Sequence, residues 1–255
     1  MILARPPIRL LRDWVESVRR YGPLYLAAYL FDRVRVRRAE RAEGFDAASG
    51  TDTAAITYPW NLPSVPREAT SEVHAYETAP ASLIRSALAA IPLRPGEFTF
   101  VDLGSGKGRV LLVASHLPFA RIVGVELSEE LHRIAQENVR RYRLADQRCT
   151  TFSLLCMNAV EYGFGSEPLV LFLYNPFGES TIRDVLANLA ASLRATPRDA
   201  YVIYVNPRFE ALLRSAPFLQ IVARCGSWWR PWSRYAIYAA SALAIRSAPT
   251  AMKAE

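Results

Sequence analysis

The chain has 255 residues, enough for one large α/β domain with an extension, and 51% of them are hydrophobic, as in a soluble globular protein. The formal net charge is +7, but only Lys107 and Lys253 among the 31 basic residues are lysines. With abundant Ala, this skew towards Arg is typical of a GC-rich coding sequence, so the net charge does not by itself indicate a nucleic-acid-binding protein.

The basic excess lies mainly in residues 1–43, which hold ten Arg against five acidic residues. Two helical pieces are predicted here, separated at Gly22-Pro23. The first has apolar residues at three- and four-residue steps between Ile8 and Val18, flanked by Arg. Such a basic amphipathic extension either packs on its own domain or lies on an anionic membrane surface, and the sequence leaves both open.

Neither an export signal nor a membrane span is predicted. The uncharged run 21–31 is too short to cross a bilayer, and no small-residue cleavage site follows it. The cysteines are odd in number and lack the spacing of metal ligands. We therefore expect a cytoplasmic protein without a metal, peripheral to the inner membrane face if residues 1–43 bind lipid.

Residues 44–71 are predicted to be a linker, because Gly, Ser and Pro punctuate them and apolar periodicity is weak. The main domain is expected at residues 72–245. An aromatic and polar segment containing Tyr76 and Thr78 comes just before its first helix and first core strand. These two residues are candidates for covering a ligand at the turn that follows, although Thr78 could equally be only a helix cap.

The stretch 99–110 predicts a strand, a tight turn and a helix in succession. The apolar strand ends at Asp102, and the turn then has glycine at every second position: Gly104, Gly106 and Gly108. Glycine lets the backbone adopt a positive φ and approach a ligand without a Cβ in the way. A P-loop requires Ser or Thr after Gly-Lys, and a dinucleotide-binding turn spaces its glycines differently, so both fit poorly.

The acid-x-Gly-x-Gly-x-Gly pattern closely resembles motif I of the class I S-adenosylmethionine (SAM)-dependent methyltransferases. This resemblance implies SAM as the cofactor, with Asp102 and Gly104 at its methionine end, which Tyr76 and Thr78 are expected to cover. It also implies that Ser105, Gly106 and Gly108 belong to the cofactor-binding turn.

The next strand, predicted over 121–127, contains a carboxylate near its end. Glu126 is placed to accept hydrogen bonds from both hydroxyls of an adenosine ribose. Ser128 follows as a natural N-cap for the next helix. The alternative is that Glu126 is only a solvated charge at a strand end.

The third strand, predicted over 151–156, leads to Asn158 at the edge of the expected adenine site. Many class I methyltransferases carry Asp at this position, where it accepts a hydrogen bond from the adenine amino group. Asn keeps a carbonyl oxygen that accepts the same bond, so the assignment carries over in principle.

A continuous apolar run over 169–173 predicts a buried parallel strand that opens into Tyr174, Asn175, Pro176 and Phe177. The carboxyl ends of such strands hold substrates in doubly wound sheets. Amide and carbonyl oxygens suit an amine acceptor, and the aromatic rings offer an apolar wall. The segment resembles the Asn-Pro-Pro-aromatic motif of methyltransferases acting on adenine N6 or glutamine N5, with one proline missing; a plain strand-ending turn is the alternative.

The remaining pattern predicts a helix around 182–193, a strand over 200–205, a helix over 208–215 and two late strands near 219–223 and 234–240. Three tryptophans and an arginine within 228–232 either stack on a base or pack on the domain. With the class I resemblance, the expected fold is α/β: a doubly wound Rossmann-like seven-stranded sheet of order 3-2-1-4-5-7-6 with an N-terminal helical extension.

The Tyr-x-x-x-Pro pattern at 76–80, together with Asp-Leu-Gly-Ser-Gly at 102–106, looks like the non-SET lysine methyltransferases. These include histone enzymes of the telomeric-silencing type and relatives that modify an ATP-synthase c subunit. The resemblance implies methyl transfer to nitrogen, with a protein amine as the favoured acceptor. No residue stands out in the sequence as a general base, and Glu77 is only a candidate. The alternatives are a nucleic-acid adenine-N6 methyltransferase, with residues 1–43 binding phosphate, and a non-catalytic SAM-fold protein attached to membrane.

Overall fold

The computed structural model describes the two isolated residues 34 and 38 and the ranges 44–54, 56–57, 62–66, 76–92, 94–226 and 234–240. Except for residues 34 and 38, the range 1–43 in which two helices are predicted lies outside the described residues. The tryptophan-rich segment 228–232 lies outside them as well. Their roles therefore stay predictions.

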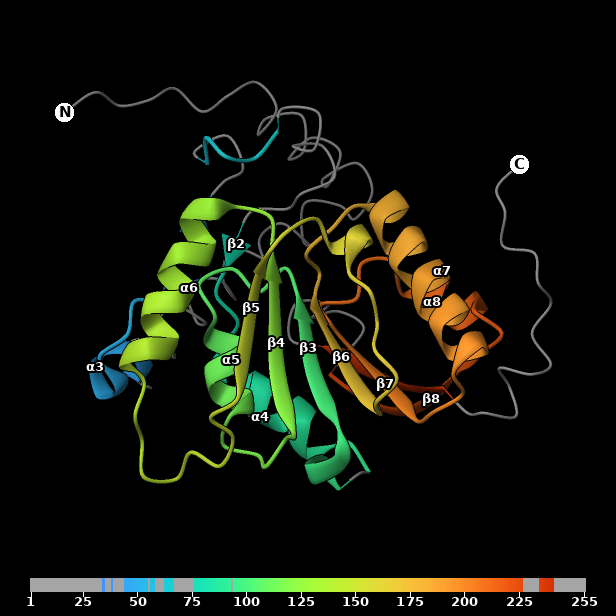
Figure 1. Cartoon of the computed structure of the whole chain (residues 1–255), viewed down its shortest axis with the longest axis horizontal. Helices are drawn as coiled ribbons and strands as arrows, with labels where there is room; N and C mark the ends of the chain where they lie inside the picture. Colours follow the sequence, from blue (N-terminus) through green and yellow to red (C-terminus); the bar gives the residue numbers. More distant parts are fainter. Residues whose placement is uncertain are drawn as a thin grey trace.

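A seven-stranded sheet with the order β5-β4-β3-β6-β7-β9-β8 forms the centre of the domain (Figure 1). Adjacent strands from β5 to β7 are parallel, and β9 is antiparallel to both of its neighbours. Renumbered in chain order, this is the predicted order 3-2-1-4-5-7-6. The strands are β3 (Thr99–Leu103), β4 (Arg121–Glu126), β5 (Phe152–Cys156), β6 (Leu169–Tyr174), β7 (Ala200–Val205), β8 (Leu219–Cys225) and β9 (Tyr235–Ala240).

Helices cover both faces of this sheet. The apolar side of α4 and α5 packs on one face, and α7 and α8 pack on the other, each with its own buried cluster. In Figure 1, α4 to α6 lie on the left and α7 and α8 on the right. The helices are α3 (Phe45–Ser49), α4 (Ala81–Ala89), α5 (Arg109–Ala114), α6 (Glu129–Arg141), α7 (Glu179–Ala195) and α8 (Glu210–Ser215).

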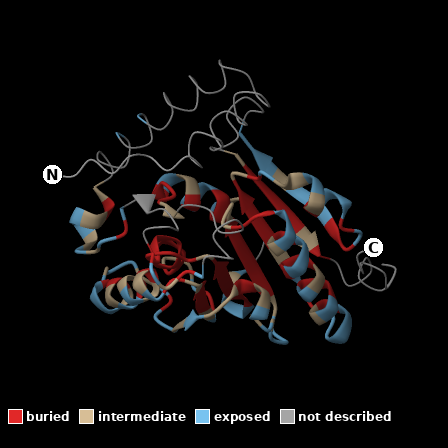
Figure 2. Ribbon diagram, turned by 90° about the horizontal axis from the view of Figure 1, so that it is seen from above, coloured by how far each residue is buried: buried red, intermediate tan, exposed pale blue. Residues whose placement is uncertain are grey.

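Burial follows the hydrophobic pattern of the strands. All residues of β6 except Tyr174 are buried, because this central strand is covered on both faces. Figure 2 shows these buried strands between helices whose outer sides are exposed. No helix among the described residues combines the length and the apolar character needed to cross a membrane.

Two short strands, β1 (Ile56–Thr57) and β2 (Tyr76–Glu77), form a separate antiparallel pair. Helix α3 and β1 fall inside the range predicted to be a linker, so part of that range is ordered against the domain. Residues 157–168, all described, connect β5 to β6 with the 3-10 helix η4 (Ala159–Glu161) as their only helical element. Another 3-10 helix, η3 (Pro95–Glu97), leads into β3.

Candidate functional site

Asp102 lies near the carboxyl end of β3 and is 2% exposed. Its Oδ2 has no hydrogen-bond partner among the described residues. Burial, and secondarily the nearby charge of Glu126, raises the pKa of Asp102 well above its ordinary value. A buried polar atom without a partner is uncommon in a native protein, and it marks a place where a ligand's donor group fits.

Glu126 ends the neighbouring strand β4 and holds the glycine turn in place. Its Oε2 accepts a hydrogen bond from the backbone N–H of Gly106 at 2.8 Å, and its Oε1 accepts one from the N–H of Ser128 at 2.9 Å. Burial raises the pKa of this carboxyl group, and hydrogen bonds from the backbone N–H groups of Ser128, Gly106 and Leu127 partly oppose the rise. Each carboxylate oxygen keeps a further lone pair, which suits hydroxyl donors such as those of a ribose.

The glycine turn is closely packed by side chains from distant parts of the chain. Gly104 has φ 81°, and a Cβ built on it would lie 2.6 Å from the Cβ of Pro176. Gly106 has φ 53°, and a Cβ there would collide with the ring of Tyr76. The turn therefore needs glycine both for its backbone conformation and for these contacts. The contacts bring the predicted cofactor turn, Tyr76 and the predicted acceptor motif together.

The remaining turn residues lie within the domain interior. Ser105 is 6% exposed, and its N–H donates a hydrogen bond to the carbonyl of Val125 at 3.0 Å. Gly108 precedes α5 with φ 88°, and a Cβ there would lie 3.3 Å from the Cβ of Ala135 on α6. The turn is thus fixed between β4 and the two helices that follow it.

Residues 44–54, here called the strap, anchor the segment that was predicted to cover the cofactor. The backbone carbonyl of Thr53 accepts hydrogen bonds from the hydroxyls of Tyr76 at 2.7 Å and Thr78 at 2.9 Å. Asp46 in turn holds Thr53, accepting from its N–H at 2.9 Å and from its hydroxyl at 2.6 Å. Arg109 donates to the Thr53 hydroxyl at 2.6 Å, which ties the strap to the start of α5.

A second set of contacts ties the strap to the glycine turn itself. The Lys107 ammonium lies 3.0 Å from Oδ1 of Asp52 and is largely buried. The Asn138 side chain on α6 accepts from the N–H of Asp52 and donates to the carbonyls of both Asp52 and Lys107. Sequence reasoning missed these residues, because the partners lie 31 to 86 positions apart and no local pattern connects them.

The predicted acceptor motif follows β6 directly. Asn175 adopts φ 42°, a left-handed conformation unusual for a residue other than glycine. Phe177 is buried at 8% exposure, whereas Tyr174 is half-buried. The hydroxyl of Tyr204 on β7 lies 3.4 Å from the Asn175 Oδ1. The motif thus places one amide and two aromatic rings at the carboxyl edge of the sheet, beside the glycine turn.

Asn158 has a structural contact of its own. Its Oδ1 accepts a hydrogen bond from the N–H of Val160 at 3.2 Å and so caps η4. The preceding residue, Met157, donates its N–H to the carbonyl of Glu126 at 3.0 Å, which keeps Asn158 close to the end of β4. Contact with an adenine ring stays a prediction for this residue.

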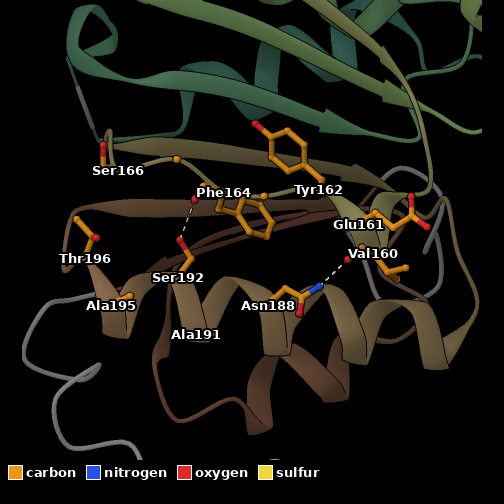
Figure 3. Close-up of a pocket in the computed structure, with 12 residues that line it drawn as sticks. Val160, Glu161, Tyr162, Phe164, Ser166, Asn188, Ala191, Ser192, Ala195 and Thr196 are labelled. Carbon is orange, nitrogen blue, oxygen red and sulfur yellow. Dashed lines mark hydrogen bonds between the residues drawn. The ribbon is translucent and has the colours of Figure 1, made fainter.

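A separate open groove of about 620 Å³ lies between the β5–β6 connection and α7 (Figure 3). Its walls are joined by two hydrogen bonds, from Asn188 Nδ2 to the Val160 carbonyl at 2.7 Å and from the Ser192 hydroxyl to the Phe164 carbonyl at 3.1 Å. None of the predicted site residues lines it. No cluster of His, Cys, Asp and Glu suited to a metal ion occurs in the part of the chain that the structure describes.

One family model matches part of the chain. Residues 67–166 match the model of the family described as histone methylation protein DOT1, which is less than half of the chain. The matched range contains Tyr76, the glycine turn, Glu126 and Asn158. The sequence has no match among curated proteins.

Solved structures with a similar arrangement include TrmN from Thermus thermophilus, at 16% identity and a TM-score of 0.45, over 64% of this chain and 49% of that one. Magnesium protoporphyrin IX methyltransferase from Synechocystis, with bound SAM, has 16% identity and a TM-score of 0.43 over 63% and 76% of the two chains. An RNA methyltransferase from Salinibacter ruber, with S-adenosylhomocysteine, has 17% identity and a TM-score of 0.44 over 69% and 99%. The chain spans about half the length of TrmN.

The strand order is that of the Rossmann-like methyltransferase fold, and residues 67–166, which contain the glycine turn, match a methyltransferase family model. The acceptor groups at the strand ends fit S-adenosylmethionine. The buried Asp102 oxygen without a partner suits an ammonium group, and the Glu126 carboxylate suits ribose hydroxyls.

Proposed function

We propose that this enzyme methylates an amine nitrogen and that its acceptor is a lysine side chain of a protein. The observation that carries the proposal is the packing of Pro176 on Gly104, which sets the Asn175 turn directly beside the cofactor turn. The match to a family described by histone methylation supports a protein acceptor.

SAM held by Asp102, Gly104 and Glu126 would supply an electrophilic sulfonium methyl group to the acceptor nitrogen, with a neutral thioether as the leaving group. For a lysine acceptor with an unperturbed pKa of about 10.4, a proton must leave the ammonium first. The rings of Tyr174 and Phe177 provide apolar surroundings that favour the neutral amine. The chain's main contribution is then to hold the acceptor in line, which supplies much of the rate enhancement.

In this proposal each part of the cofactor and the acceptor amine have assigned residues. Asp102 would hold the ammonium of the cofactor, Glu126 the ribose and Asn158 the adenine amino group. Tyr76 and Thr78 would close over the methionine end, held by the strap through the Thr53 carbonyl. Asn175 would accept a hydrogen bond from the acceptor amine.

The test is incubation of purified protein and methyl-labelled SAM with lysate from a strain lacking the gene. Label in protein that survives nuclease, and that is recovered as methyl-lysine after hydrolysis, is the expected outcome. Label in nucleic acid, recovered as N6-methyladenine, would replace the proposal with the adenine alternative. Label in small molecules alone would overturn both.

A further inference from the structure

Two adjacent strands end in the same unusual turn. Among the described residues, the only non-glycine residues with positive φ are Asn175 at 42° and Asn206 at 50°. Each of them immediately precedes a proline. Strands β6 and β7 are parallel and end with Tyr174 opposite Val205, so the two asparagines are the next residues along neighbouring strands.

This conformation is strained for any residue with a Cβ. Asn tolerates the left-handed region better than most, but the following proline further restricts the backbone. Strained residues persist where the surrounding structure holds them, and they cluster at functional sites. Two such turns side by side, the first packed on the cofactor turn through Pro176 and Gly104, point to a shared role.

The hydroxyl of Tyr204 connects the two turns. It accepts a hydrogen bond from the N–H of Phe209, just beyond the second turn, at 3.2 Å. Because it has a single proton, it donates that proton towards Oδ1 of Asn175, 3.4 Å away. Burial raises the pKa of Tyr204 to about 12, so the hydroxyl keeps its proton at neutral pH.

We propose that the Asn206 turn is the second half of the acceptor site, and that Tyr204 is a positioning residue that holds both halves in register. The proposal rests on the function proposed above and names the acceptor chemistry more closely. A neutral primary amine has two N–H groups and one lone pair. Two amide oxygens, one from Asn175 and one from Asn206, would accept both N–H groups and leave the lone pair directed at the methyl carbon.

Two variants and one control test the proposal. Asn206→Gly removes the amide but retains a residue that adopts positive φ without strain. Tyr204→Phe removes only the hydroxyl. Tyr238→Phe is the matched control, because Tyr238 is also fully buried, lies on the neighbouring strand β9, and its hydroxyl has no hydrogen-bond partner among the described residues.

Turnover is measured as label transferred from methyl-labelled SAM to the lysate protein fraction, and SAM affinity by calorimetry. We expect Asn206→Gly and Tyr204→Phe each to lower the maximal rate at least tenfold while SAM affinity stays within twofold and thermal unfolding stays cooperative. The control should keep both values.

Three results would overturn the inference. A maximal rate within twofold of wild type in either variant would remove that residue from the acceptor site. An equal loss of SAM affinity and rate would make Tyr204 merely structural. Absence of label transfer by the wild-type protein to any fraction would instead refute the proposed function, and the inference would fall with it.

Discussion

At the scale of single residues, the Asp102 carboxyl group makes the stability of the protein depend on pH. Its pKa in the folded protein is raised, chiefly by burial. Between the unfolded value of about 3.9 and the raised folded value, the native state holds the proton more tightly than the unfolded chain. Stability therefore falls as pH increases through this interval, because ionising a buried group without a partner is unfavourable.

The variant Asp102→Asn lacks this titrating group. Its free energy of unfolding should therefore decrease less than that of the wild type as pH is raised from 5 to 8. The same change should weaken SAM binding by about 2 kcal/mol, roughly 30-fold, because a charged acceptor for the ammonium is lost. Thermal melts across that pH range, with and without SAM, measure both effects. Parallel pH dependence in variant and wild type would contradict the assignment of the titrating group.

The proposed contact between Glu126 and the ribose of the cofactor can be tested by mutation. Glu126→Ala removes the acceptor for two backbone N–H groups and for the ribose, so we expect about 2 kcal/mol weaker binding of S-adenosylhomocysteine. The wild type should also discriminate against the 2′-deoxy analogue, and the variant should not. The exposed Glu161, at η4, gives the control Glu161→Ala. If the variant still discriminates between the two nucleosides, another group holds the ribose.

At the scale of elements, the strap lies within the range predicted to be a linker, yet it contacts Tyr76 and Thr78 of the proposed site. Asp46→Ala removes the acceptor for the Thr53 N–H and hydroxyl, and we expect about 2 kcal/mol of lost stability within this segment. Without the strap, the Thr53 carbonyl no longer fixes Tyr76 and Thr78, so SAM affinity should fall as well.

Hydrogen exchange measures the strap prediction directly, because opening of the segment exposes its amides. The N–H groups of Thr53 and Gly106 should exchange faster in Asp46→Ala, while those of β6 should be unchanged. Asp184→Ala, at an exposed position on α7, is the control. Unchanged exchange at Thr53, or faster exchange through the whole sheet, would show that Asp46 does not hold the strap closed independently of the sheet.

The elements differ in how far the sequence predicts them, and burial explains the difference. The sequence predicts strand β7 at its observed bounds. A short, mostly apolar run is typical of a parallel strand that is covered on both faces of the sheet. The strap has no such pattern, because its order comes from polar pairs such as Arg109 with Thr53, 56 positions apart. The sequence contains the second Asn-Pro pair, at 206–207, but only the register of β6 and β7 shows that it lies beside the first.

At the scale of the whole molecule, the site joins segments that are far apart in sequence. The strap, β2, the glycine turn and the end of β6 meet at one place, so a cofactor bound there would contact parts of the chain that separate on unfolding. A ligand that binds the native state but not the unfolded chain raises the free energy of unfolding. The gain is about 2.7 kcal/mol when free ligand is at 100 times its dissociation constant.

For a chain of this size, that gain corresponds to an increase in melting temperature of about 5 to 11 °C. We expect the intact protein to show this shift with SAM and with S-adenosylhomocysteine, but a smaller one with ATP, which shares the adenosine and lacks the ammonium that Asp102 would accept. Asp184→Ala should keep the full shift, whereas Asp102→Asn and Glu126→Ala should reduce it at the same SAM concentration. Equal shifts with SAM and ATP would mean that the strand ends recognise only the nucleoside, and Asp102 would lose its assigned role.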